Sequence, residues 1–138
     1  VGRGPAARAK LIDMLDTPDS AVRSWAAVGL AVLGRDAEPA SAPLMPLLAD
    51  AGRHVRLAAA EALAKLGGAS EALPVIVKAL DDEDGWVRLH AAIVLVSIGE
   101  HARGAVSQMK EAAADSRKHQ AALYVRWALL HALDNLGE

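Results

Sequence analysis

The chain has 138 residues, 53% of them hydrophobic, and a formal net charge of −2 from 15 basic and 17 acidic residues. This balance supplies no general attraction to phosphate backbones or anionic membranes, which argues against nucleic acid as a partner. The absence of Cys excludes disulfides, thiolate nucleophiles and Cys-based zinc sites, and no apolar run approaches the roughly 20 residues of a membrane-spanning helix, so we expect no membrane insertion.

A repeated pattern runs through the chain and predicts helices. Each copy begins with Val-Arg, continues through an Ala- and Leu-rich stretch, and reaches a Gly 12 residues after the Val. Apolar residues fall 0, 4, 8 and 11 residues after each Val, which is the spacing of one helix face, and the Gly suits the left-handed residue that ends a helix. The four copies are Val22-Arg23 to Gly34, Val55-Arg56 to Gly67, Val87-Arg88 to Gly99 and Val125-Arg126 to Gly137.

Each of these second helices is expected to follow a first helix with which it pairs. We expect Thr17, with Pro18 behind it, and Asp84 to cap second helices at their N-termini. The last spacing between repeated Val residues is longer than the others, which predicts an insertion near Asp115–His119. Leu129-Leu130 replaces the Ala pair of the other copies, so the last pair needs different packing or a cap. The expected first helices are Leu11–Leu15, Pro43–Leu48, Leu73–Leu80 and Ala105–Ala114.

The Asp-rich turn, the Val-Arg pair, the paired Ala and the closing Leu-Gly resemble the HEAT-like repeats named after phycobilisome lyases. The predicted fold is therefore all-α, an α-α superhelix of about four antiparallel helix pairs. We expect one domain over residues 1–138, with repeats at about 5–34, 40–67, 70–99 and 102–137. Because the chain begins Val-Gly-Arg-Gly-Pro without Met, we expect it to be part of a longer protein.

Several segments also resemble the helical extensions that follow the catalytic domain in some bacterial arylsulfatase-like proteins. The chain contains no sulfatase active-site motif, so this resemblance implies an accessory role. The segments are Leu11–Leu15, Ala21–Ala26, Asp81–Ser97, Tyr124–Ala128 and His131–Leu133.

The recurrent Arg side chains suggest two interpretations. A row of guanidinium groups can bind an anionic ligand, but a long Arg side chain more often packs its stem and pairs with a nearby carboxylate. Asp19 and Asp84, each three residues before a repeated Val, are the expected partners in their own copies. We therefore interpret the row as structural. Its members are Arg23, Arg56, Arg88 and Arg126.

No pattern predicts catalysis, a cofactor or a metal. The run Asp81–Gly85 superficially resembles a calcium loop, but the twelfth residue from Asp82 is Ile93 instead of the Glu that closes an EF-hand. We interpret this run as a turn before a helix N-terminus, where negative charge is favoured. The five His form no HxxxH or HExxH pair; they are His54, His90, His101, His119 and His131.

The second helices carry a candidate partner-binding face. Exposed Trp anchors interfaces, whereas Trp in a core without Phe fills volume, and the sequence leaves both possibilities open. The resemblance implies that second helices line the concave side of the superhelix. The members of this face are Trp25, Leu57, Glu61, Leu89, His90, Ile93, Trp127 and His131.

The function that we expect is a non-catalytic scaffold or accessory module. It would bind a protein, or an adjacent domain of the same polypeptide, through the concave face. The alternative is a solenoid that binds an anionic ligand or nucleic acid through an Arg- and Trp-lined groove, as HEAT-like DNA glycosylases do.

Overall fold

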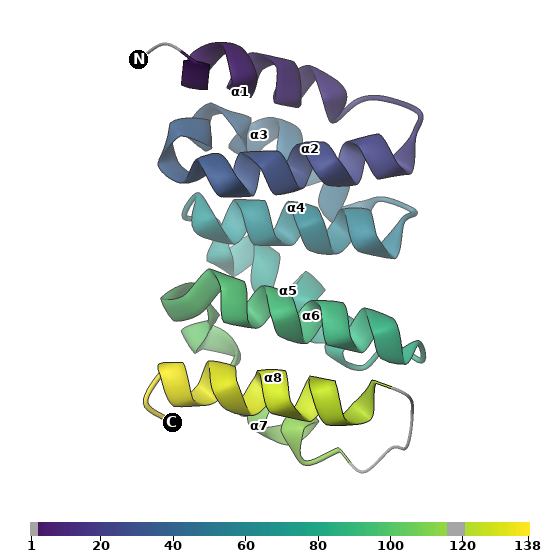
Figure 1. The fold of residues 1–138 in the computed structure, drawn as a ribbon, viewed down its shortest axis with the longest axis vertical. Helices are drawn as coiled ribbons and strands as arrows, with labels where there is room; N and C mark the ends of the chain where they lie inside the picture. The colour runs from purple at the N-terminus through teal and green to yellow at the C-terminus, as the bar shows by residue number, and fades with distance from the viewer. Residues whose placement is uncertain (1–2, 116–120) are drawn as a thin grey trace.

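The computed structural model describes residues 3–115 and 121–138, in which helices and short turns build a stack with no strand among the described residues (Figure 1). The second helices lie side by side in one layer, in chain order along the stack. This arrangement is the predicted all-α solenoid. The second helices are α2 (Ser20–Leu33), α4 (Arg53–Lys65), α6 (Gly85–Ile98) and α8 (Ala122–Asn135).

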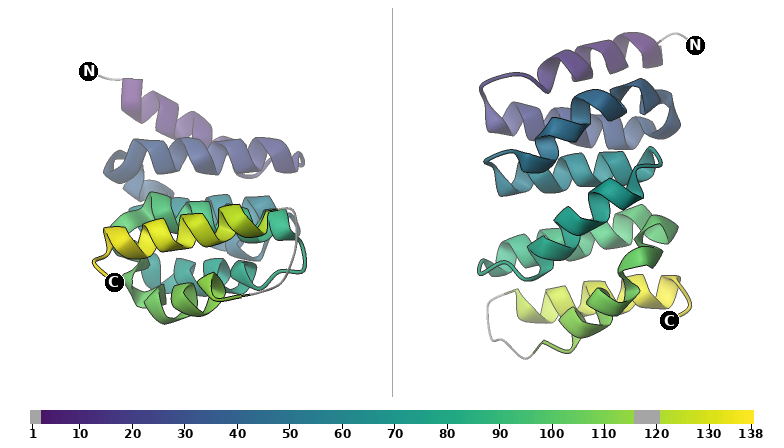
Figure 2. Two further views of the ribbon diagram at one scale, coloured as in Figure 1. Left: turned by 60° about the horizontal axis from the view of Figure 1, so that its bottom comes forward. Right: turned by 180° about the vertical axis from the view of Figure 1, so that it is seen from behind.

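The first helices of the later pairs form a layer behind the second helices, and they are seen from behind in Figure 2. They are less regular than the second helices, because 3₁₀ segments precede or extend two of them. The first helices are α1 (Arg3–Met14), α3 (Ser41–Leu44), α5 (Ala69–Leu80) and α7 (Val106–Ala113), and the 3₁₀ segments are η1 (Gly34–Ala40), η2 (Met45–Ala49) and η3 (Gly99–Ala105).

The prediction of one continuous helix at Pro43–Leu48 is wrong. The segment divides into the four-residue helix α3 and the 3₁₀ segment η2, with Pro46 in the first turn of η2. Proline has no amide proton to donate and its ring crowds the preceding turn, so Pro43 and Pro46 prevent a long α-helical ladder. The expected insertion falls largely on residues 116–120, which lie outside the described residues.

The ends of the second helices show why the Val-to-Gly interval is constant. Asp84 accepts a hydrogen bond from the amide of Trp86 (2.9 Å), which confirms the predicted cap of α6. The predicted cap at Thr17 is wrong, because Asp19 accepts from the amides of Ala21 (2.8 Å) and Val22 (3.4 Å) at the start of α2. All four closing glycines have positive φ, between 56° and 96°, where a side chain would be strained.

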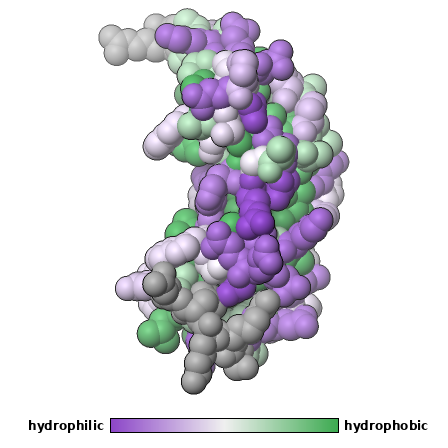
Figure 3. Space-filling model, turned by 90° about the vertical axis from the view of Figure 1, so that its right-hand side faces the viewer, coloured by the Kyte–Doolittle hydropathy of each residue, from purple (hydrophilic) through white to green (hydrophobic). Residues whose placement is uncertain are grey.

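One continuous apolar core lies between the two layers. Leu30, Leu63, Leu95 and Leu129 are fully or almost fully buried, and the Ala pairs of α2, α4 and α6 are buried with them. In the last pair Leu129 is buried but Leu130 is exposed. The stack curves, and its hollow side, at the left of Figure 3, is the side on which the second helices lie.

Candidate functional site

The recurrent Arg side chains donate hydrogen bonds to the turns that precede their own helices. In Arg23, Arg56 and Arg88, Nη1 donates to the two backbone carbonyls that lie six and five residues earlier. For Arg23 these are the carbonyls of Thr17 (2.8 Å) and Pro18 (2.9 Å). Because these carbonyls precede a helix start and have no partner in the helix, the Arg satisfies polar groups that the tight turn would otherwise leave unpaired.

The prediction that Asp19 and Asp84 pair with these Arg side chains is wrong, since both carboxylates cap helices instead. Arg23 pairs with Asp50, in the turn before the following second helix. Its Nε lies 2.9 Å from Asp50 Oδ2 and its Nη2 lies 3.2 Å from Oδ1, while Oδ1 also accepts from the amide of Gly52 (2.8 Å). The Arg23 guanidinium holds the pKa of the Asp50 carboxyl below its ordinary value of 3.8, and the Gly52 amide assists. This pair joins two consecutive repeats.

A second set of positions on each second helix faces the hollow side. These positions lie 1 residue before the repeated Val and 3, 6 and 10 residues after it, which is one stripe of a helix beside the buried stripe; the small Ala58 and Ala128 within it are buried. We call this surface the groove face. Its members are Ala21, Trp25, Val28 and Val32 in α2, His54, Ala58, Glu61 and Lys65 in α4, Trp86, His90, Ile93 and Ser97 in α6, and Tyr124, Ala128, His131 and Asn135 in α8.

The groove face contains a shallow hollow between α2, α4 and α6, which we call the Trp25 hollow. Trp25 is 72% exposed beside it, so the Trp does not fill the core. The hollow encloses about 450 Å³, and carbon atoms form most of its walls. It is lined by Ser20, Ala21, Ser24, Trp25, Gly52, Arg53, His54, Val55 and His90.

Two histidines from neighbouring helices meet at the Trp25 hollow. The Nδ1 atoms of His54 and His90 lie 2.9 Å apart, and the rings stack with centroids separated by 5.1 Å. A hydrogen bond at this distance requires one Nδ1 to donate and the other to accept, so the two Nδ1 atoms share one proton. Burial lowers the pKa of His90, and the nearby His54 lowers it further, while Glu61 opposes both. His90 is therefore favoured in its uncharged form.

Glu61 also lies on the groove face, but its carboxylate is already engaged. Glu61 Oε1 accepts from Ser97 Oγ of α6 (2.5 Å) and from Lys65 Nζ one turn along α4 (3.1 Å). The contact with Lys65 neutralises its charge, and the contact with Ser97 joins α4 to α6. Glu61 thus positions the helices of the groove.

The other residues of the predicted face differ in how exposed they are and in which side of their helix they occupy. Ile93 and His131 are exposed on the groove face. Leu57 is only 1% exposed and cannot contact a partner, which corrects its assignment, because it faces α5 and the start of α6 in the following repeat. Leu89 holds the same helix position in α6 and is half-buried. Trp127 holds that position in α8 and is exposed.

Sequence reasoning did not include His54 in the candidate face. The signal was present, since His54 immediately precedes the repeated Val55 and this position belongs to the same helix stripe as Trp25. The equivalent residues Trp86 and Tyr124 are also exposed.

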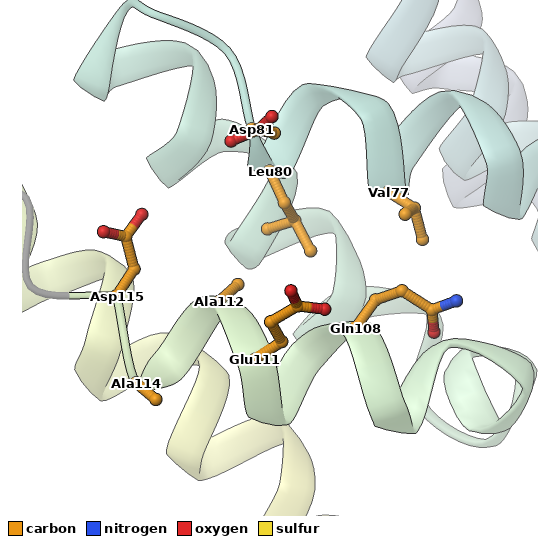
Figure 4. Close-up of a pocket in the computed structure, with 8 residues that line it drawn as sticks. All are labelled: Val77, Leu80, Asp81, Gln108, Glu111, Ala112, Ala114 and Asp115. Carbon is orange, nitrogen blue, oxygen red and sulfur yellow. The ribbon is translucent and has the colours of Figure 1, made fainter.

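On the opposite side of the molecule, a cavity of about 500 Å³ lies between α5 and α7. Figure 4 shows Gln108 and Glu111 of α7 directed toward α5, with Asp81 and Asp115 at one end. Its acidic lining does not suit an anionic ligand. Among the described residues, no group of three or more His, Asp or Glu is placed to hold a metal ion.

Comparison with known proteins identifies the repeat. The sequence matches the HEAT repeats over residues 41–134, which is more than half of the chain. The chain belongs to the HEAT-repeat family. No curated protein matches it. HEAT repeats generally form protein-interaction scaffolds and are typically non-catalytic. Within the described residues, none of the helices is both long and apolar enough to cross a membrane.

Proposed function

We propose that this HEAT-repeat chain is a non-catalytic module that binds a protein segment along its groove face, centred on the Trp25 hollow. The exposed indole of Trp25 beside a mostly apolar hollow is the observation that carries the proposal. An exposed Trp provides a large, rigid contact area, and such residues dominate the energetics of many interfaces.

The surroundings of Trp25 indicate the chemistry of the partner. The His54–His90 pair places two imidazole rings beside the hollow, with His90 favoured in its uncharged form, and Lys65 neutralises Glu61. An apolar side chain of the partner would fill the hollow while a backbone polar group meets a ring nitrogen. An adjacent domain of the same polypeptide is one source of such a segment, in line with the resemblance to accessory extensions of arylsulfatase-like proteins.

The alternative, an Arg- and Trp-lined groove for nucleic acid or another anion, finds less support. Arg88 is buried, and the guanidinium of Arg23 is occupied by Asp50 and by two carbonyls. Hydrogen-bond donors of these two side chains are therefore already paired within the protein. Tight binding to a phosphate backbone requires several free basic groups along one groove.

A peptide selection tests the proposal and does not require that the partner be identified. A displayed library of random peptides is selected against the wild-type chain, and the affinities of the best sequences are measured by fluorescence anisotropy. Trp25→Ala should weaken them by about tenfold or more, equivalent to about 1.4 kcal/mol. Met45→Ala, on the exposed side of the first-helix layer, is the matched control and should leave the affinities unchanged.

Equal losses in the two variants, or no loss in either, would exclude the Trp25 hollow as the binding centre. A parallel titration with short duplex DNA tests the alternative. Binding that weakens steeply as salt rises would favour the anionic ligand and overturn the proposal, because counterion release is characteristic of phosphate contacts.

A further inference from the structure

Two of the recurrent Arg side chains use their donors differently. Arg23 Nη1 bonds the preceding turn, while Nε and Nη2 bond the two carboxylate oxygens of Asp50 (2.9 and 3.2 Å). Arg56 Nη1 likewise bonds the carbonyls of Asp50 (2.6 Å) and Ala51 (3.3 Å), but no described residue accepts a hydrogen bond from its Nε or Nη2. The edge of Arg56 that corresponds to the occupied edge of Arg23 is therefore open.

The sequence explains why this edge stays open. Asp82 is the counterpart of Asp50 one repeat later, since each carboxylate accepts from the amide two residues further on and each carbonyl accepts from the next recurrent Arg. Asp82 Oδ1, however, also accepts from Arg53 Nη1 (3.1 Å). Arg53 lies two residues before the repeated Val, where α2 has the uncharged Ser20. A second Arg in α4 thus engages the carboxylate that would otherwise pair with Arg56.

A cavity of about 550 Å³ lies beside Arg56, between η2, α5 and the starts of α4 and α6. Three basic side chains and one acidic side chain line it, so positive charge is in excess. The exposed ammonium group of Lys78 has no partner within the part of the chain that the structure describes. We call this cavity the Arg56 cleft. Its charged lining consists of Arg53, Arg56, Lys78 and Asp82, and its apolar walls include Leu48 and Val75.

We propose that the Arg56 cleft binds an Asp or Glu side chain of a partner polypeptide, with an apolar residue next to it in the partner. The Arg23–Asp50 pair shows the geometry, in which a carboxylate accepts two bonds from Nε and Nη2 of one guanidinium. Lys78 adds a second positive charge, and the walls at Leu48 and Val75 accommodate the apolar neighbour. A free inorganic anion would leave these walls uncovered.

The Arg56 cleft is distinct from the Trp25 hollow. Among the described lining residues, the two surfaces share Arg53 alone. Binding of an acidic segment at the Arg56 cleft therefore does not depend on the proposed binding at Trp25. It also differs from binding to a nucleic acid, because one guanidinium edge and one ammonium group do not follow a phosphate backbone.

The side-chain Nε–H signals of Arg in NMR spectra of the ¹⁵N-labelled chain test the proposal. The probe is the blocked peptide acetyl-Leu-Asp-Leu-amide, whose carboxylate is its single charge, and the Asn counterpart of this peptide is the control. The Arg56 signal, assigned by its loss in Arg56→Gln, should shift and saturate with a Kd on the order of 1 mM, because a short peptide makes few contacts. The Arg23 signal should not move, since Asp50 already occupies that edge.

Variants locate the binding. Arg56→Gln, with folding confirmed by its melting curve, should weaken the Asp peptide at least about tenfold, as measured from backbone amide signals around the cleft. Lys78→Gln should weaken it about threefold. Lys10→Gln, which removes another exposed Lys from a first helix, is the matched control and should leave the affinity unchanged. Trp25→Ala should also leave it unchanged, which separates this site from the Trp25 hollow.

Three results would overturn this inference. An Arg56 signal that the Asp peptide does not move would mean that the open edge binds no carboxylate. Equal shifts with the Asn peptide would mean that the apolar walls bind the peptide without its charge. Tighter binding of inorganic phosphate than of the Asp peptide would make the cleft a site for free anions instead.

Discussion

The bond between Arg23 and Asp50 offers a direct test of how consecutive repeats are held together. Asp50→Ala removes two charge-assisted hydrogen bonds from Arg23 and one from the Gly52 amide. The side chains of Arg23 and Asp50 are 17% and 9% exposed, so the pair lies between a surface ion pair, worth up to about 1 kcal/mol, and a buried one, whose disruption costs about 3–5 kcal/mol. We expect a loss of about 2 kcal/mol, or about 7 °C in Tm for a chain of this length.

A double-mutant cycle with Arg23→Ala and Asp50→Ala, measured by urea unfolding, separates the pair from the other contacts of each residue. The coupling free energy should be about 1–2 kcal/mol. Glu100 and Arg103 form a matched control pair, because they also make a two-bond contact but are both largely exposed. Glu100→Ala should change the stability by no more than about 0.5 kcal/mol.

The pH dependence of the same pair provides a second test with a definite sign. The folded state lowers the pKa of Asp50 below 3.8, so the unfolded chain takes up this proton at higher pH than the folded chain. The stabilisation is therefore complete well above pH 3.8 and is lost as the pH falls through the folded-state pKa. The difference in stability between wild type and Asp50→Asn should shrink in that window. A coupling below about 0.5 kcal/mol, or a difference that grows on acidification, would refute the reasoning.

Three further changes test the groove and the helix ends. Since burial and His54 lower the pKa of His90 below 6.5, stability is complete above that pH and falls as the pH drops toward the folded-state pKa; His90→Gln should flatten this slope in urea titrations. Asp84→Ala deletes the cap of α6 and should cost about 1 kcal/mol in thermal unfolding. Gly99→Ala forces φ of 56° on an L side chain and should cost about 1–2 kcal/mol, whereas Gly4→Ala, in helix α1 with open space around it, should not destabilise the chain.

Local signals in the sequence predict much of the fold. Each second helix has a start just before the repeated Val, an apolar stripe and a left-handed end at the Gly, and these depend on neighbouring residues alone. The errors also have local causes. Thr17 resembles a cap because Pro18 follows it, but Arg23 donates to the carbonyls of both, which keeps them in the turn, and Asp19 is the N-cap.

The candidate site is less predictable, because exposure depends on how repeats stack. Trp25 and Trp127 both lie on second helices, and periodicity identifies the buried stripe without indicating which other stripe faces the groove or the next repeat. The hydrogen bonds and ion pairs between repeats are equally hard to predict from the sequence. Asp50 and Arg23 are 27 residues apart, each in the turn region before or at the start of consecutive second helices, yet Asp19 is much nearer to Arg23 in sequence and is the more obvious partner.

The groove face and the contacts between repeats use different features of the same repeat. The groove face lies on the hollow side of the stack, where His54 and His90 join α4 to α6 and fix the shape that a partner meets. The Arg23–Asp50 pair joins the start of α2 to the turn before α4 and lies outside the lining of the Trp25 hollow, so Asp50→Ala tests how the repeats are held together without removing a side chain that a partner would contact.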